Sequence, residues 1–259
     1  MTAHPHHHLI PLVLHLLAGG ALGVTSASLA GHFGWRAADR LPGDSRMPHC
    51  LYCLRAFEWH ETFPLFGWFL RQPMLAFPCP CGARKGLWPQ PAMELIGLAF
   101  GLAAMALAGW SWASLPLIIG LGLLPAIALI DLHFGVIPDE LNILVALTAL
   151  GWIALSHGDY YLPLVVATAL LALGLFFALV YSRLRGREML GLGDVKFFAA
   201  AGLWLPPILA PWFLAVAGLA GVLFSVVWQR AGGGKELPFA PALCVSLAAC
   251  IFYRLVHMP

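Results

Sequence analysis

The stretch ASLPLIIGLGLLPAIALID at residues 113–131 decides the class of this protein. It carries no charged residue before its last position, Asp131. About 20 apolar residues in a helix cross a hydrocarbon layer about 30 Å thick, so the stretch predicts a membrane-spanning helix with a carboxylate at one end. The whole chain has this character, because 61% of its 259 residues are hydrophobic, 10% are charged and the mean hydropathy is +0.84. This composition excludes an ordinary soluble domain.

Apolar blocks of roughly 18 to 22 residues recur along the chain and predict an all-α polytopic membrane protein with about eight transmembrane helices. The sixth block is shorter, and we expect it to form a tilted or half-buried helix. The expected spans are residues 9–31, 92–109, 113–131, 140–157, 160–181, 195–206, 208–228 and 238–256.

A segment rich in Pro, Cys, Trp and Arg separates the first expected span from the second. It has no apolar block long enough to cross a bilayer. The sequence therefore predicts three parts: a first transmembrane helix in residues 1–34, a small cytoplasmic cysteine-containing domain in residues 35–91, and a membrane-embedded domain in residues 92–259.

The basic residues predict how the chain is oriented in the membrane. With eight spans, three loops within residues 35–91, 183–196 and 230–235 fall on one side and hold 13 of the 14 Lys and Arg residues. Basic loops stay on the cytoplasmic side, so we assign that side to the cytoplasm and expect both ends of the sequence to face outward. Only Arg254 departs from the pattern.

Two carboxylates fall at the expected membrane boundary. Asp131 closes the third span, and Asp194 lies in GLGDVKFF at the entrance of the sixth. Both are expected at cytoplasmic helix ends, at about the same depth. Two neighbouring carboxyls do not both ionise easily, so one keeps a proton while the other is charged. Such a pair can activate a water molecule against a peptide carbonyl.

Each of these carboxylates also has a structural interpretation. Asp194 follows Gly191 and Gly193, and on sequence statistics alone the residue type favours a helix N-cap or turn. Asp131 could also be a carboxylate at the membrane interface that forms an ion pair with a residue of the basic loops. Asp139 follows Pro138 and precedes a helix, so we predict that it is an N-cap.

Four cysteines in the cytoplasmic segment form two close pairs, Cys50-x-x-Cys53 and Cys79-x-Cys81. Four thiolates suit a tetrahedral structural zinc, and a cytosolic location argues against stable disulfides. Zinc is our prediction, with reduced metal-free cysteines or a redox pair as the alternatives. Two further cysteines in the last span are expected to pack as small apolar groups without a functional role.

Three motifs in this order resemble the prepilin peptidase family, the membrane aspartyl proteases with a Gly-x-Gly-Asp motif. The family shows an Asp followed by Pro-Asp in one cytoplasmic loop, then Gly-x-Gly-Asp-x-Lys, then a Pro-Phe-Gly-Pro type segment. The matching residues here are Asp131, Pro138 and Asp139, then Gly191, Gly193, Asp194 and Lys196, then Pro238, Phe239, Ala240 and Pro241, with Ala in place of Gly.

The resemblance implies that Asp131 and Asp194 are the catalytic pair. It implies cleavage of the basic leader of prepilins or pseudopilins at the cytoplasmic face of a bacterial inner membrane. It also implies N-methylation of the new N-terminus with S-adenosylmethionine, although no glycine-rich methyl-donor loop is found in the sequence. The expected partners are these substrates and the lipid bilayer, with no nucleic acid. The family's cytoplasmic domain has two C-x-x-C pairs, and the second pair departs from that pattern here.

Two other functions fit parts of the sequence. A presenilin-like intramembrane protease shares the Gly-x-Gly-Asp motif, but the cysteine-containing domain argues against it. In an ion-coupled or proton-coupled transporter, Asp131 and Asp194 would bind cations or protons. No internal repeat supports a transporter, and a position at the helix ends suits hydrolysis better than ion binding at the midplane.

Overall fold

The computed structural model describes residues 6–38, 90–156, 158–185, 190–230, 232 and 237–258. Within these ranges all regular elements are helical and there is no β-strand. The predicted all-α architecture is therefore confirmed for the part of the chain described. The predicted cysteine-containing domain lies almost wholly outside these residues, between the first two helices.

Each expected span coincides with helical structure. The elements are α1 (His6–Ala38), α3 (Gln90–Ala108), α4 (Ser114–Phe134), α5 (Asp139–Leu155), α6 (Tyr161–Leu175), the π-helix η4 (Phe176–Tyr181), α7 (Ser182–Arg185), α8 (Leu192–Gly202), the 3₁₀ helix η5 (Pro207–Leu209), α9 (Ala210–Arg230) and α10 (Ala240–His257). Helix α1 continues to Ala38, beyond the boundary predicted at residue 34.

Five helical segments are long and apolar enough to cross a membrane: Pro11–Gly34, Ser114–Phe134, Tyr161–Val180, Pro207–Arg230 and Ala240–His257. Helix α8 has only 11 residues, so it crosses about half of a hydrocarbon layer. The short sixth block was expected to behave in this way. The protein is thus a multi-pass membrane protein, and the full count of eight spans stays a prediction.

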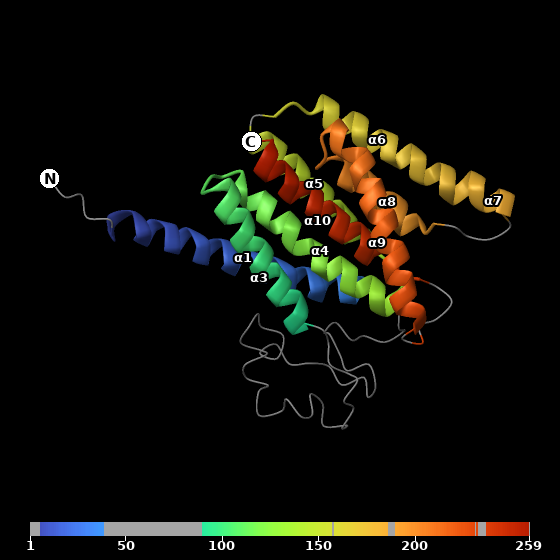
Figure 1. Ribbon diagram of the computed structural model, residues 1–259, viewed down its shortest axis with the longest axis horizontal. Coiled ribbons are helices and arrows are strands. Elements are labelled where there is room, and N and C mark those ends of the chain that lie inside the picture. The colour runs from blue at the N-terminus through green and yellow to red at the C-terminus, as the bar shows by residue number, and fades with distance from the viewer. Residues whose placement is uncertain are drawn as a thin grey trace, which may run out of the picture.

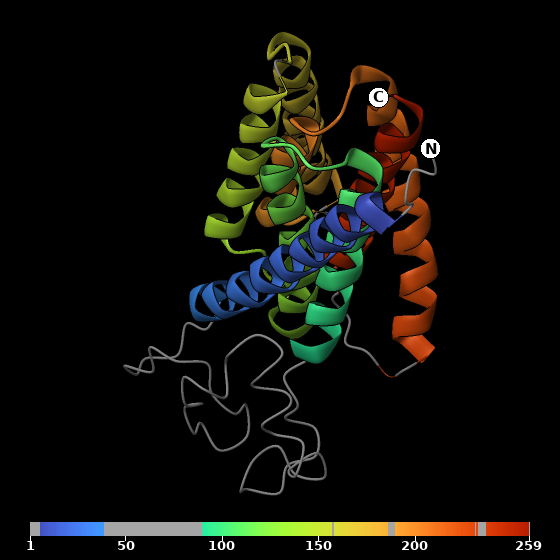
Figure 2. The same cartoon turned by 90° about the vertical axis from the view of Figure 1, so that its left-hand side faces the viewer.

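Helix α4 runs through the middle of the bundle (Figure 1) and contacts α1, α3, α5 and α10. Helix α8 packs on α5 and α6, and α9 packs on α10. Figure 2 shows the C-terminus at one end of the bundle and the last residues of α9 at the other end. The second of these ends also holds the last turn of α4 and the first turns of α5, α8 and α10.

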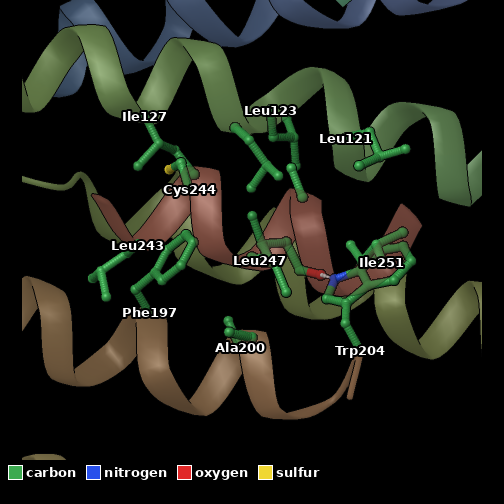
Figure 3. Packing of buried hydrophobic residues seen from close by; sticks show 14 of the residues in the cluster. Leu121, Leu123, Ile127, Phe197, Ala200, Trp204, Leu243, Cys244, Leu247 and Ile251 are labelled. Atoms are coloured by element: carbon green, nitrogen blue, oxygen red, sulfur yellow. Dashed lines mark hydrogen bonds between the residues drawn. The ribbon is translucent and has the colours of Figure 1, made fainter. Parts of the chain in front are cut away.

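The buried core joins α4, α8 and α10. Figure 3 shows Leu121 of α4 and Leu247 of α10 in this core, together with Trp204 directly after α8. The indole Nε1 of Trp204 donates a hydrogen bond of 3.1 Å to the carbonyl oxygen of Val145 in α5, so a buried polar atom is satisfied. This packing fixes α8 against its neighbours although α8 is too short to span.

Helices α1 and α3 approach each other through glycines. A Cβ atom added to Gly97 would lie 2.6 Å from the carbonyl oxygen of Gly23, and one added to Gly101 would lie 2.1 Å from that of Gly19. Small residues four positions apart allow helix backbones to pack closely in a membrane, where van der Waals contact replaces the hydrophobic effect between helices. This contact holds α1 close beside α3.

Arg254, the exception to the charge pattern, has a structural explanation. Its Nη1 donates a hydrogen bond of 2.9 Å to the carbonyl oxygen of Trp204, and its guanidinium carbon lies 4.3 Å from the ring centroid of Trp152. The two tryptophan rings stack with centroids 5.4 Å apart. The charge is therefore compensated by a carbonyl and a π-face, at the end of α10 opposite to Ala240.

Candidate active site

A cavity of about 410 Å³ lies where the ends of α1, α4, α5 and α8 meet. It brings together both carboxylates predicted to be catalytic, Asp131 and Asp194. The remaining lining residues are Ala37 and Ala38 of α1, residues 135–138 of the α4–α5 turn, Asp139 and Glu140 of α5, and Gly191, Leu192, Gly193 and Lys196 of α8 and its N-cap. The two carboxyls, one in the last turn of α4 and the other in the first turn of α8, thus lie at the same cavity.

Asp131 lies in the last turn of α4 and is only 5% exposed. Its Oδ2 accepts a hydrogen bond of 2.8 Å from the backbone N–H of Ala240, the first residue of α10. The N-terminus of a helix carries a partial positive charge and free N–H groups, so it orients and stabilises a carboxylate. This contact gives Asp131 a partner at the start of α10.

The Pro-Phe-Ala-Pro segment creates this contact. Pro238 is buried, Phe239 is the N-cap of α10, and Pro241 occupies the first turn of the helix. Proline has its φ angle preset for a helix and lacks an N–H that the first turn would leave unbonded. The prolines therefore fix where α10 begins, and the N–H of Ala240 reaches Asp131.

Asp194 lies in the first turn of α8, outside the five helices that are long enough to span. The N-cap of α8 is Gly191, so the structural alternative that Asp194 is itself the N-cap is wrong. Burial, and after it the charge of Asp131, raise the pKa of Asp194 from 3.8 to about 7 against the opposing effect of a backbone hydrogen bond with Gly191. At neutral pH Asp194 can thus carry a proton.

The glycines of the motif permit close approach. A Cβ atom on Gly193 would lie 3.3 Å from the Cβ of Ile137 and 3.5 Å from that residue's backbone N and O atoms. A Cβ atom on Gly191 would lie 3.3 Å from Oδ2 of Asp194. The loop before α8 therefore packs on the turn between α4 and α5, which brings Asp194 to the cavity that Asp131 lines.

Asp139 forms an ion pair with Lys196 across the rim of the cavity. The Nζ atom of Lys196 lies 2.7 Å from both carboxylate oxygens of Asp139. The prediction that Asp139 is a helix N-cap is wrong, because Pro138 occupies the N-cap and no side chain caps this helix. A carboxylate that follows a proline can cap a helix or form an ion pair, and here Lys196 of α8 lies close enough for the ion pair. The pair connects α5 to α8.

Comparison with known proteins identifies the family. Residues 118–226, which contain Asp131, Asp139 and Asp194, match the model of the type IV leader peptidase family. A protein of Escherichia coli named type 4 prepilin-like proteins leader peptide-processing enzyme is 30% identical over 215 residues, covering 80% of this chain and 75% of that protein. The chain belongs to the type IV leader peptidase family.

Other members of the type IV leader peptidase family are equally similar. A prepilin leader peptidase/N-methyltransferase of Neisseria gonorrhoeae is 31% identical, with 82% of this chain and 71% of that protein covered. A prepilin leader peptidase/N-methyltransferase of Burkholderia pseudomallei is 32% identical, with 81% of this chain and 67% of that protein covered. No solved structure matches the chain significantly.

One residue at this candidate site, Asn142, was not predicted from the sequence. Asn142 of α5 is 5% exposed, and its Nδ2 donates a hydrogen bond of 3.3 Å to the carbonyl oxygen of Gly193. Its place three residues after Asp139, on the same helix face, was the signal available. Ala240 belongs to the Pro-Phe-Ala-Pro segment found in the sequence, but its contact with Asp131 is made by the backbone N–H and was not predicted.

The cysteines predicted to bind zinc, Cys50, Cys53, Cys79 and Cys81, lie outside the residues that the structure describes. Within the described ranges there is no group of three or more His, Cys, Asp or Glu side chains that could hold a metal ion. Zinc binding by the cysteine pairs therefore stays a prediction. Cys244 and Cys250 are buried in the hydrophobic core, as expected for thiols that pack as apolar groups.

Proposed function

We propose that this leader peptidase family member cleaves the basic leader from prepilins or pseudopilins at the cytoplasmic face of a bacterial inner membrane, with Asp131 and Asp194 as its catalytic pair. The observation that carries the proposal is that both carboxyls line one cavity at the end of the bundle. Two carboxyls that share a cavity and one proton can activate water for attack on a peptide bond.

The proposed mechanism assigns different roles to the two residues. Asp131, whose Oδ2 accepts the N–H at the positive end of α10, is the base that takes a proton from water. The resulting hydroxide oxygen bonds to the scissile carbonyl carbon. Asp194, with a pKa raised to about 7, gives its proton to the carbonyl oxygen. When the tetrahedral intermediate collapses, the C–N bond breaks and the amine leaves with the proton held by Asp131. Asp194 takes back a proton from a hydroxyl group of the intermediate as the carbonyl re-forms, so both carboxyls return to their starting states.

The position of the cavity supports a substrate that is itself anchored in the membrane. The long apolar helix α4 ends at the cavity and α10 begins beside Asp131, so a scissile bond between a basic leader and a hydrophobic helix would arrive at the same depth. Among the described residues Arg183, Lys196 and Arg230 lie at helix ends on this side, which supports its assignment to the cytoplasm.

Methyl transfer is the second activity that we propose. The relatives from Neisseria gonorrhoeae and Burkholderia pseudomallei carry N-methyltransferase in their names. We infer that this chain likewise methylates the new N-terminus and that S-adenosylmethionine is the methyl donor. The four cysteines between α1 and α3 have the donor set for a structural zinc, which would organise that segment.

The test is in-membrane cleavage of a model prepilin by the unaltered protein and by the Asp131→Asn and Asp194→Asn variants at equal expression. Asn keeps the shape of Asp and removes the titratable group, so we expect cleavage to fall by about 10²- to 10⁴-fold or more. Asp159→Asn is the matched control, because Asp159 is exposed and, in the part of the chain that the structure describes, its Oδ1 accepts only the nearby N–H of Tyr161.

The outcomes separate the site from the activity. If both Asn variants at the cavity cleave as well as the control variant, the catalytic pair is assigned wrongly. If the unaltered protein releases no leader from any prepilin or pseudopilin tested, the proposed peptidase activity is wrong.

A further inference from the structure

One face of α5 contacts α8 and its flanking residues at three successive turns. Asp139, Asn142 and Val145 are three residues apart and so share that face of the helix. The carboxylate of Asp139 binds Nζ of Lys196, the amide of Asn142 donates to the carbonyl of Gly193, and the carbonyl of Val145 accepts from the indole of Trp204. The α5 helix thereby holds α8 at both of its ends.

The middle contact is the unusual one, because Asn142 is almost fully buried. Its Nδ2 bonds to Gly193, but its Oδ1 has no hydrogen-bond partner among the described residues. A buried polar atom without a partner destabilises a protein, and an apolar side chain of the same size would avoid that cost. Stability alone therefore does not explain an amide at this position.

The carbonyl that Asn142 holds belongs to the residue directly before Asp194. Gly193 lies in the first turn of α8, where its missing side chain lets the backbone approach Ile137. Fixing that carbonyl fixes the rotation of the first turn, and with it the direction in which the Asp194 side chain leaves the backbone. Asp131 is oriented independently, by the N–H of Ala240.

We propose that Asn142 is a positioning residue for the peptidase reaction: its buried amide holds the Gly193 carbonyl and so sets the direction of Asp194 toward Asp131. The inference rests on the proposed function. Asn142 is not among the residues that line the cavity, so it acts through Asp194 and not on the substrate. Its loss should lower the rate of the chemical step and leave substrate binding in place.

The experiment uses the purified full chain and a model prepilin, and it measures kcat, KM and the thermal unfolding temperature. In Asn142→Leu we expect kcat to fall about 10- to 100-fold, because one oriented contact is lost, with KM changed less than about twofold. We expect the unfolding temperature to stay the same or rise, because a buried unpaired oxygen is removed. Asn142→Ser tests the same loss with a smaller side chain if the Leu variant does not fold.

Thr148→Val is the matched control on the same helix. Among the described residues the hydroxyl of Thr148 bonds only to the carbonyls of Leu144 and Val145 within α5, so its removal should leave kcat unchanged. If the unaltered protein cleaves and Asn142→Leu or Asn142→Ser cleaves at the same rate, the inference is overturned while the proposed function stands. A parallel fall of kcat and unfolding temperature would assign Asn142 a purely structural role and would also overturn it. If the unaltered protein does not cleave the model prepilin, the proposed function is wrong and the inference fails with it.

Discussion

The carboxyl of Asp194 changes its charge near neutral pH. Its pKa is raised to about 7, so it is mostly protonated below that pH and mostly ionised above it. In the proposed mechanism this proton goes to the scissile carbonyl. We therefore expect kcat/KM for prepilin cleavage to fall as the pH rises through about 7, by about tenfold per pH unit at the alkaline end.

A pH–rate profile of the purified protein checks this expectation. The Asp159→Asn variant should give the same profile, because Asp159 lies at the start of α6, away from the residues that line the cavity. A rate that stays constant between about pH 6 and 9 would show that Asp194 does not supply the proton.

At the residue scale, the sequence analysis named the two carboxylates of the candidate site but not the contacts that orient them. Asp131 and Asp194 were candidates because charged residues at the ends of apolar helices are rare, and the resemblance of the surrounding motifs to the prepilin peptidase family singled them out as the catalytic pair. Asn142 contacts a residue 51 positions away, and the N–H that orients Asp131 lies 109 positions away. Contacts over such separations follow from helix packing, which one sequence does not reveal.

At the scale of single helices, the close contact between α1 and α3 predicts that Gly97→Ala destabilises the protein. A Cβ atom on Gly97 would lie 2.6 Å from the carbonyl oxygen of Gly23 and 2.7 Å from the Cβ of Ala27, so Gly97→Ala must push the two helices apart. Overpacking of this kind typically costs about 1 to 3 kcal/mol, and we expect a lower thermal unfolding temperature in detergent.

Gly218→Ala is the control for this change in α9. A Cβ atom there has no heavy atom within 4 Å, so the substitution should be neutral or slightly stabilising. Equal unfolding temperatures for Gly97→Ala and Gly218→Ala would contradict the close approach of α1 and α3.

The helices themselves were largely predictable, and their packing was not. Hydropathy identified the apolar blocks, and α9 and α10 begin and end within a few residues of the expected spans. Helix α8 was expected to start near residue 195, yet it begins at Leu192 because Gly191 takes the N-cap position. Its contacts with α5 and α6 depend on side chains from three helices, and no single segment encodes them.

The segment between α1 and α3 provides a prediction for the whole molecule. If Cys50, Cys53, Cys79 and Cys81 bind a structural zinc, elemental analysis of the purified protein should find about one zinc per chain. The double variant Cys50→Ser/Cys53→Ser should lose it. Cys244→Ala is a matched control, because that thiol is buried in the core and belongs to no possible metal group among the described residues. Folded, active protein without zinc would contradict the prediction.

The orientation of the whole bundle in the membrane can be tested from its two ends. Glu140 is exposed at the cavity, and Asp159 is exposed near the start of α6, on the opposite side of the bundle. If the cavity faces the cytoplasm, a membrane-impermeant thiol reagent added to intact spheroplasts should label Asp159→Cys and not Glu140→Cys. After the spheroplasts are permeabilised, the reagent should label both variants.

The native cysteines of residues 50–81 would share the cytoplasmic side, so the unaltered protein serves as the unlabelled control before permeabilisation. In the reverse orientation these native cysteines would face outward and be labelled in intact spheroplasts in every form, the unaltered protein included. That outcome would place the cavity on the outer side of the membrane, where a leader retained in the cytosol could not reach Asp131 and Asp194.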